Sequence, residues 1–314
     1  MATGKRSKQS EESKESKGTA FNRGTGLLVI EVRYSNPNGD PDAESEPRTL
    51  DADGRGLISP VSFKRKLRDL VADQQGPVWL EAKRVLKLQA NGDVRKYGIL
   101  ESRGRNREEI FRKTAQQFTQ AFWDGRVFGN TFLEDIKGKD YKPGEKDHFI
   151  STGVVQFGPG ISVAPIEVER LTTTNKAGVE EGKDRGMAPL GWRVVRHAVY
   201  SMPFFVNPMM ARKSGCEARD IELMKFLIPH AYRSTASALR PFVEVRRAWY
   251  AEHKSPLGSC PDSLILDALT PKRVKGKPDE PSTSIEEYEI PSEMPPDLRN
   301  RLASFEDLCT KQRE

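Results

Sequence analysis

The stretch GLLVIEVRYSNPNGDPD, residues 26–42, joins an apolar segment to a loop crowded with asparagine, proline and aspartate. Apolar side chains alternate along residues 26–34, which predicts a β-strand because successive side chains of a strand point to opposite faces. Leu28, Ile30 and Val32 fall on one face, whereas the opposite face turns polar towards the end of the segment. We therefore expect a strand that packs against a core and leads into a polar loop.

The loop SNPNGDPD, residues 35–42, could be a metal site, a plain turn or part of a binding surface. Asn36, Asn38 and Asp40 carry oxygen atoms at alternate positions, as an EF-hand calcium loop does. However, the preceding segment is a strand, Gly39 comes two positions too early, and the twelfth position holds no glutamate. These mismatches favour a surface turn limited by its prolines over a calcium site.

A helix is expected to begin at Ser59, in the segment SPVSFKRKLRDLVAD, residues 59–73. Serine is a favoured N-cap, and Pro60 suits the first helical position because its missing N–H is not needed there. Four apolar residues form one stripe at helical spacing: Phe63, Leu67, Leu70 and Val71.

Further elements follow along the chain. Helices are expected at about 108–123 and 217–235, the second of them kinked or split at Pro229. Strand-like segments lie at 151–158, 161–174, 192–206 and 243–253. This order predicts an α+β domain, built like a split βαβ or ferredoxin-like sheet with large insertions. The RNA recognition motif (RRM) has the same topology and holds RNA on an open sheet face.

Composition divides the 314 residues into three parts. Residues 1–22 are rich in Ser, Lys and Glu, so we expect a disordered tail. Residues 23–275 are expected to form the α+β domain, in which the polar and basic residues 75–107 are an insertion. Residues 276–314 are expected to be an acidic, proline-rich C-terminal tail with a short helix near 297–310.

The sequence lacks the patterns of several enzyme and metal-binding classes. It has no GxxxxGK[ST] phosphate loop, no GxGxxG after a strand and no HExxH. Its three cysteines, Cys216, Cys260 and Cys309, form no CxxC pair, which argues against a thiolate zinc site or a disulfide framework. We therefore expect no metal and no cofactor, and we interpret His197, which lies in an alternating strand, as a structural or surface histidine.

Charge and the absence of long apolar runs indicate the setting of the protein. The net charge of +6 favours an acidic partner such as nucleic acid. The N-terminus lacks the apolar core of a secretory signal, and no apolar run approaches the roughly 20 residues of a membrane span. We therefore expect a cytoplasmic protein with no membrane partner.

The segment KRKLR, residues 64–68, is the first feature that points to nucleic acid. Arg65 lies one helical turn before Asp69 and can pair with it, whereas Lys64 and Arg68 at the same spacing are both positive. An external anion would remove the mild penalty of these like charges. Phosphate contacts therefore suit this cluster, with a solvated basic face as the alternative.

A glycine-rich excursion at residues 175–191 is the second such feature, and it is expected to be a long hairpin between two strands. Its tip places Met187 near Arg185, and an apolar wedge beside basic residues suits insertion between bases. An ordinary flexible loop is the alternative. A third feature is the helix-to-strand junction with Arg233 and Arg240, where nearby aromatic residues could stack on bases or fill the core.

Together these segments resemble the backbone subunit of type I CRISPR surveillance complexes (Cascade), most closely that of the type I-C branch. The resemblance covers about residues 25–260 and rests first on SNPNGDPD after a strand, followed by RGLISPVSFKRKLRD. The other matches follow in order: DGRVFGNTF, TGVVQFGPGISVAPIEVERLTTTN, WRVVRHAVYSMPFFVN and RSTASALR.

The resemblance implies a ferredoxin-like, RRM-type palm with finger insertions and a hairpin thumb, here at about residues 168–192. Members of the family stack head to tail along a guide RNA (crRNA) as a helical filament, and they grip the backbone while base pairing reads the target. They serve antiviral defence without a catalytic role. The implied partners are crRNA, target DNA, further copies of the chain, other Cascade subunits (the guide-end cap and the large and small subunits) and a recruited nuclease-helicase.

The resemblance also assigns RNA-binding residues. Those on the helix and the loop beside it are Lys64, Arg65, Arg68, Asn36 and Asn38. Those of the thumb base and tip are Thr172, Thr173, Thr174, Asn175, Arg185 and Met187, and those of the junction are Arg233 and Arg240. The loop thus looks like a rigid element at the palm edge that shapes the guide groove, and the insertion 75–107 could add contacts to target DNA.

Two alternatives stay open. The first is a ribonuclease on the same fold, which processes guide precursors or cuts target RNA, with Asp40, Asp42 and Asp124 as the loop carboxylates to test. The second is a single-stranded RNA-binding module that acts alone.

Overall fold

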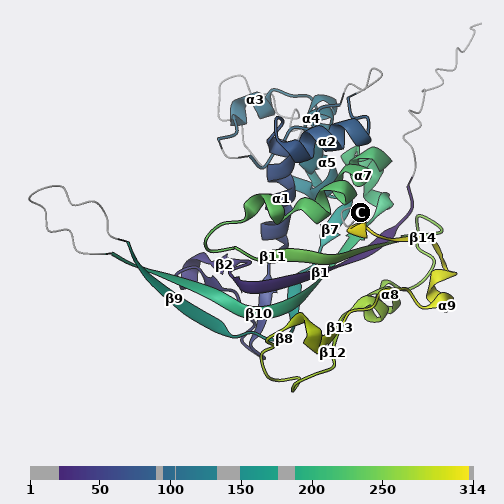
Figure 1. The fold of residues 1–314 in the computed structure, drawn as a ribbon. Coiled ribbons are helices and arrows are strands. Elements are labelled where there is room, and N and C mark those ends of the chain that lie inside the picture. Colours follow the sequence, from purple (N-terminus) through teal and green to yellow (C-terminus); the bar gives the residue numbers. More distant parts are fainter. Residues whose placement is uncertain (1–20, 90–94, 103, 133–148, 176–187, 311–314) are drawn as a thin grey trace, which may run out of the picture.

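The computed structural model describes residues 21–89, 95–102, 104–132, 149–175 and 188–310. Most of the expected N-terminal tail lies outside these ranges. One large sheet crosses the molecule, with helices on one face and C-terminal segments on the other (Figure 1). Within the same ranges, no helix is long and apolar enough to cross a bilayer.

The large sheet is antiparallel throughout its described pairings. Its strands are β1 (Gly24–Ser35), β4 (Arg55–Ile58), β7 (Val155–Phe157), β8 (Gly160–Pro165), β9 (Val168–Asn175), β10 (Ala188–Val206), β11 (Val243–His253) and β14 (Leu302–Asp307). They lie in the order β14-β11-β1-β10-β8-β4, and β7 and β9 also pair with β10. Three two-stranded sheets are formed by β2 (Gly39–Asp40) with β3 (Glu46–Pro47), β5 (Gly129–Phe132) with β6 (Phe149–Thr152), and β12 (Lys272–Arg273) with β13 (Tyr288–Glu289).

The centre of the sheet has a ferredoxin-like order. The four strands of a βαββαβ unit are here β1, β8, β10 and β11, in the order of the chain. In the sheet they lie side by side as β11-β1-β10-β8, which is the order 4-1-3-2 of a ferredoxin-like fold. The two helices of that unit are α1 (Pro60–Ala72) and α7 (Ala218–Leu227). This arrangement confirms the predicted α+β class.

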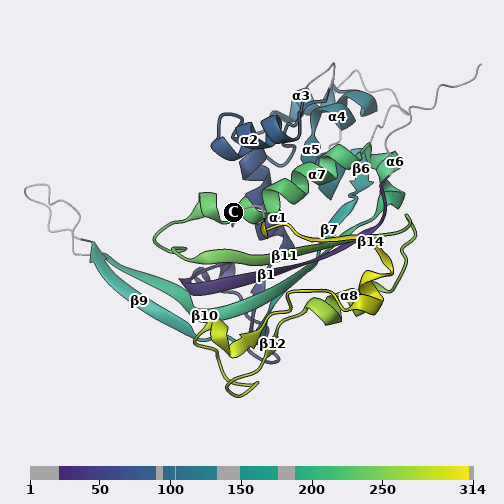
Figure 2. The ribbon, with the colours of Figure 1, turned by 45° about the vertical axis from the view of Figure 1, so that its right-hand side comes forward.

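Helices cover one face of the sheet and bury its larger core. The helices of this layer are α1, α2 (Pro77–Val85), α5 (Trp123–Phe128) and α7 (Figures 1 and 2). Leu28, Ile30 and Val32 of β1 pack there against Phe63 and Leu67 of α1, and all five side chains are fully buried. Each such side chain contributes about 1.5–3 kcal/mol of burial free energy. The alternating apolar residues of β1 and the apolar stripe of α1, both predicted from the sequence, thus pack in one core.

The opposite face is covered by the C-terminal region, which differs from the expected tail. Its helices are α8 (Asp262–Leu269) and α9 (Pro296–Arg299), and β12, β13 and β14 complete it. Leu27 and Val29 pack there against Tyr288, Met294 and Leu302. The helix expected near 297–310 is only the single turn of α9, and β14 then pairs with β11. Widely spaced apolar residues anchor this acidic, proline-rich stretch, and such spacing has no helical or strand period.

Two expected helices are broken. The segment 108–123 forms α3 (Arg107–Phe111) and α4 (Ala115–Ala121), because Thr114 starts α4 with a capping box to Gln117. Past α7, the segment to residue 235 continues as separate 3₁₀ turns around Pro229. The insertion 75–107 is not merely polar surface, since α2 buries Trp79 in the core.

The excursion expected as a hairpin is bounded by paired strands. The register runs from Val168 opposite Val195 to Asn175 opposite Ala188, and the two strands project from the body of the molecule (Figures 1 and 2). Residues 176–187 lie outside the described residues, so the expected tip is not placed.

Candidate nucleic-acid interface

The loop after β1 is fastened to the start of α1. Ser59 caps the helix, since its hydroxyl accepts a hydrogen bond from the Ser62 N–H at 3.2 Å. The Asn38 side-chain oxygen accepts from the Ser59 N–H at 2.7 Å. Asn38 therefore positions the helix on which the basic residues lie.

The Asn36 side chain is buried and links segments of the protein through hydrogen bonds, and it is not exposed at the surface. Its side-chain N–H groups donate to the carbonyl oxygens of Ser45 (2.7 Å) and Arg193 (3.2 Å). Its own carbonyl oxygen accepts from Arg240 Nε at 2.9 Å. Asn36 thus joins the loop to β10 and to the junction before β11, as a rigid loop at a sheet edge requires.

The Asp40 carboxylate of the loop has local partners. Asp40 accepts from the Asp42 N–H at 3.1 Å and forms an ion pair with Arg48 at 3.1 Å. No group of three or more His, Cys, Asp or Glu side chains able to hold a metal occurs in the part of the chain that the structure describes.

A groove of about 490 Å³ runs along one flank of α1. Lys64, Arg65 and Arg68 line it from the helix, and Phe128 and Gln156 line it from the facing strands and α5. The Lys64 ammonium lies 5.9 Å from the centre of the Phe128 ring. Burial and the neighbouring Arg68 lower the pKa of Lys64. The flank is therefore positive and has an aromatic floor.

The three basic residues of this flank differ in availability. Arg68 is 8% exposed and donates from Nε to Asp124 at 2.8 Å, so much of its charge is compensated inside the protein. Arg65 pairs loosely with Asp69 at 3.6 Å on the surface, where such pairs are weak. For Lys64, no carboxylate lies within ion-pair distance among the described residues. Lys64 and Arg65 are therefore the groups of this flank that an external anion can reach.

Asp124 is held in a structural role. It is 1% exposed and accepts hydrogen bonds from the Leu100 N–H (2.7 Å), the Glu101 N–H (3.1 Å) and Arg68. A carboxylate with three donors and no solvent access is poorly placed to act as a general base. This geometry weakens the ribonuclease alternative that named Asp124.

Lys66 on the other flank of α1 was missed by the sequence reasoning. It is 6% exposed, and its ammonium lies 5.2 Å from the centre of the Tyr232 ring. Burial and, to a smaller extent, Arg240 lower the pKa of Lys66 to about 8. The available signal was its place beside Leu67, next to the apolar stripe. Lysine is almost never so deeply buried without a partner.

The remaining predicted residues are spread over two regions. Arg233 is exposed on a 3₁₀ turn near Tyr232, and Thr172 is exposed on β9. Thr173, Thr174 and Asn175 pair through the strand register with Leu190, Pro189 and Ala188 of β10. Arg185 and Met187 lie outside the described residues. The α1 region therefore gathers the loop, helix and junction residues, while the described thumb residues lie on the projecting hairpin.

A second feature that sequence reasoning missed is an arginine stacked on an aromatic ring. The Arg33 guanidinium lies 3.4 Å from the centre of the Phe242 ring, and Arg246 lies 5.7 Å from it. The Arg33 side chain is 48% exposed. Phe242 is only partly buried and lies outside the core clusters.

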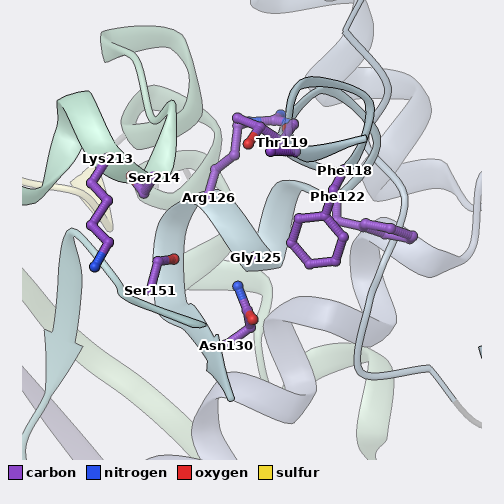
Figure 3. Close-up of a pocket in the computed structure, with 10 residues that line it drawn as sticks. Phe118, Thr119, Phe122, Gly125, Arg126, Asn130, Ser151, Lys213 and Ser214 are labelled. Carbon is purple, nitrogen blue, oxygen red and sulfur yellow. The ribbon is translucent and has the colours of Figure 1, made fainter. Parts of the chain in front are cut away.

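A small pocket of about 140 Å³ lies next to the groove and is lined by residues of α4, α5, β5, β6 and α6 (Ala211–Ser214) (Figure 3). Phe118 and Phe122 form its apolar side, and Lys213 of α6 lies across from them. Asn130 and Ser151 line both this pocket and the groove, so the two hollows adjoin.

The sheet offers no open face of the RRM kind in the described part of the chain. On the side away from the helices, His197 is 1% exposed, and its Nδ1 lies 2.8 Å from the Ser282 hydroxyl. Its ring packs near Tyr288 at 6.3 Å between centres. His197 is therefore a buried structural residue.

Comparison with known proteins finds matches whose descriptions refer to CRISPR. Residues 22–293 match the family described as CRISPR-associated protein Cas7. A curated protein of the same description from Haloferax volcanii is 25% identical over 234 residues, covering 70% of this chain and 67% of that protein. Among solved structures, a chain of a "CRISPR RNA-guided surveillance complex, pre-nicking" aligns with a TM-score of 0.44 and 15% identity, over 73% of this chain and 78% of that one. A chain of a "CRISPR RNA-guided surveillance complex" aligns with a TM-score of 0.42 and 15% identity, over 79% and 76%.

Proposed function

This chain belongs to the Cas7 family of CRISPR-associated proteins, and from that premise we propose that it is a guide-RNA-binding backbone subunit of a type I Cascade complex. The segments SNPNGDPD and SPVSFKRKLRD favour the type I-C branch. Copies of the chain stack head to tail along the crRNA spacer and support hybridisation of target DNA. The chain itself performs no cleavage, which is left to a recruited nuclease-helicase.

The observation that carries this proposal is that basic side chains lie on two sides of α1. Lys64 and Arg65 face a groove of about 490 Å³, and Lys66 lies on the other flank near Arg240. A helix with cations on two sides can contact successive phosphates of one strand, and such contacts supply most of the affinity in sequence-independent binding. The C-terminal region covers the opposite face of the sheet, which supports placing the RNA strand on the α1 side.

The remaining assignments complete the proposal. The palm with its insertions begins at residue 23 and includes the sheet strand β14, which ends at Asp307. Residues 168–192 form the thumb, and Thr172 to Asn175 with Arg185 and Met187 act there. Other Cascade subunits cap the guide end and complete the complex as its large and small subunits.

The first test is co-expression of the chain with a CRISPR array carrying either of two spacer lengths. We expect a purified particle with a high nucleic-acid absorbance ratio, RNA of uniform guide length and a mass that grows with the spacer. A monomer free of RNA would count against the proposal. Shortened RNA whose cleavage is lost on Asp40→Asn would instead favour the ribonuclease.

A matched pair of variants links the particle to the groove. Lys64→Ala removes a cation that has no carboxylate partner among the described residues, whereas Lys83→Ala changes an exposed lysine on α2. We expect Lys64→Ala to weaken RNA binding for all sequences alike and to reduce the salt slope by about one. Equal effects of the two variants would contradict the assignment of the groove.

A further inference from the structure

We propose that Lys66, Arg240 and Tyr232 form an anion site for one phosphodiester group of the bound RNA, and that occupancy of this site is coupled to uptake of a proton by Lys66. This inference rests on the proposed function, because it takes RNA as the source of the phosphodiester. It adds a residue that the resemblance does not assign, on the flank of α1 that faces away from the groove.

The first observation is a buried ammonium without a counter-ion. Lys66 is 6% exposed, and no carboxylate lies within ion-pair distance of it among the described residues. Asp69 on the same helix favours its charge only weakly and already pairs with Arg65. Buried charges in proteins are ordinarily paired, so this site lacks an anion.

The second observation is that its neighbour is also a cation. Arg240 lies close enough to oppose the charge of Lys66. Its Nε donates to the Asn36 carbonyl, and within the described part of the chain the guanidinium has no carboxylate partner. That hydrogen bond fixes the guanidinium while leaving its terminal N–H groups for an acceptor with several oxygens.

The third observation is a hydroxyl that belongs to the same cluster. The Tyr232 ring lies beside the Lys66 ammonium, and Arg240 acts on the ionisation of the Tyr232 hydroxyl. That hydroxyl is buried and has no hydrogen-bond partner in the described structure. Two cations and one orphan hydroxyl therefore belong to one cluster, and a phosphate group bound there would supply the acceptors that they lack.

The coupling to a proton follows from the same surroundings. Burial and Arg240 lower the pKa of Lys66 to about 8, so near that pH the free protein holds the site only partly charged. A phosphodiester stays negative throughout, and it favours the protonated ammonium. Binding therefore draws a proton onto Lys66, and RNA affinity falls as pH rises through this window.

The test compares wild type with Lys66→Arg and Lys66→Met, using a fluorescein-labelled single-stranded RNA and anisotropy. Between about pH 7 and pH 9, wild type should lose about tenfold in affinity, as expected when binding is linked to one proton. Lys66→Arg keeps its charge and should lose little over the same range. Lys66→Met should bind at pH 7 about as weakly as wild type does at pH 9.

Lys64→Arg is the matched control, because the pKa of Lys64 is also lowered and could contribute a slope of its own. A wild-type slope that survives in Lys66→Arg but disappears in Lys64→Arg would overturn the inference. So would full affinity in Lys66→Met. Absence of RNA binding by wild type at every pH would instead contradict the proposed function itself.

The pKa of Lys66 can also be measured directly, without comparing the RNA affinities of variants. The ¹³Cε signal of Lys66, assigned with Lys66→Arg, gives its pKa by NMR titration of the wild-type chain. We expect the pKa to rise when the same RNA is added. An unchanged pKa in protein that has bound RNA would overturn the inference and leave the proposed function standing.

Discussion

Arg68 donates its Nε–H to Asp124 at 2.8 Å, and both side chains are withdrawn from solvent. The pair joins α1 to the start of α5, beside the groove on that flank. Arg68, which the resemblance assigned to RNA binding, thus also stabilises the position of α1 relative to α5 beside the groove.

Asp124→Asn should therefore destabilise the fold. Removing the charge of one partner leaves a buried guanidinium uncompensated, which costs about 3–5 kcal/mol in comparable pairs. Urea denaturation followed by circular dichroism measures the loss. Asp42→Asn, at a loop position, serves as the control and should change stability by less than about 0.5 kcal/mol. An Asp124→Asn protein of full stability that had lost an RNA-cleaving activity would show that this carboxylate is functional.

Lys66→Met should stabilise the RNA-free protein. The pKa in the folded chain, about 8, lies below the ordinary 10.5, so the unfolded chain binds more protons between these values. The stability of wild type therefore rises with pH across this window, and at pH 7 the buried charge costs at most about 3 kcal/mol. We expect Lys66→Met to be more stable than wild type at pH 7 and the difference to shrink above about pH 9. Denaturation at both pH values checks this, and a gap that widens with pH would contradict the assignment.

Gly129→Ala should disturb the junction of α5 and β5, which forms part of the groove. Gly129 has a φ of +78°, and a Cβ there would meet the Gly153 backbone nitrogen at 2.3 Å. With a ψ of 178°, this backbone lies in a region that essentially only glycine adopts, so an L-residue there costs about 1–3 kcal/mol, and the clash adds to it. Gly191→Ala is the control, because nothing lies within 4 Å of its Cβ position. Thermal unfolding should therefore separate the two variants, and equal midpoints would refute this account.

Leu302→Ala tests whether the C-terminal region is part of the fold. Leu302 is 3% exposed in the core that covers the second face of the sheet. Truncation of such a side chain costs about 2–5 kcal/mol. Leu257→Ala, at a side chain that is 82% exposed, should leave chemical denaturation unchanged. A Leu302→Ala protein as stable as wild type would mean that this region is a dispensable tail.

Local patterns predicted the elements nearest the candidate site. The alternation of β1 and the capped start of α1 depend on neighbouring residues, and both appear as predicted. The loop residue Asn38 lies beside the helix and accepts a hydrogen bond from the Ser59 N–H, while its contact to RNA stays a prediction.

The parts that could not be predicted depend on contacts between distant segments. Tyr288 and Leu302 have no periodic pattern around them, and only the far face of β1 explains their burial. The charge of Lys66 gave no sign that Tyr232, more than 160 residues later, would cover it. Partnerships of this kind are set by the fold and not by spacing along the chain.

The place of β1 between β10 and β11 also has a consequence for synthesis on the ribosome. Both neighbours of this apolar strand are translated more than 150 residues after it. At ordinary elongation rates the strand waits on the order of 10–30 s before its first partner in the sheet emerges. During that interval its Leu- and Val-rich edge is open to other nascent chains, so we expect the yield of folded protein to depend on chaperones that hold the emerging N-terminal half.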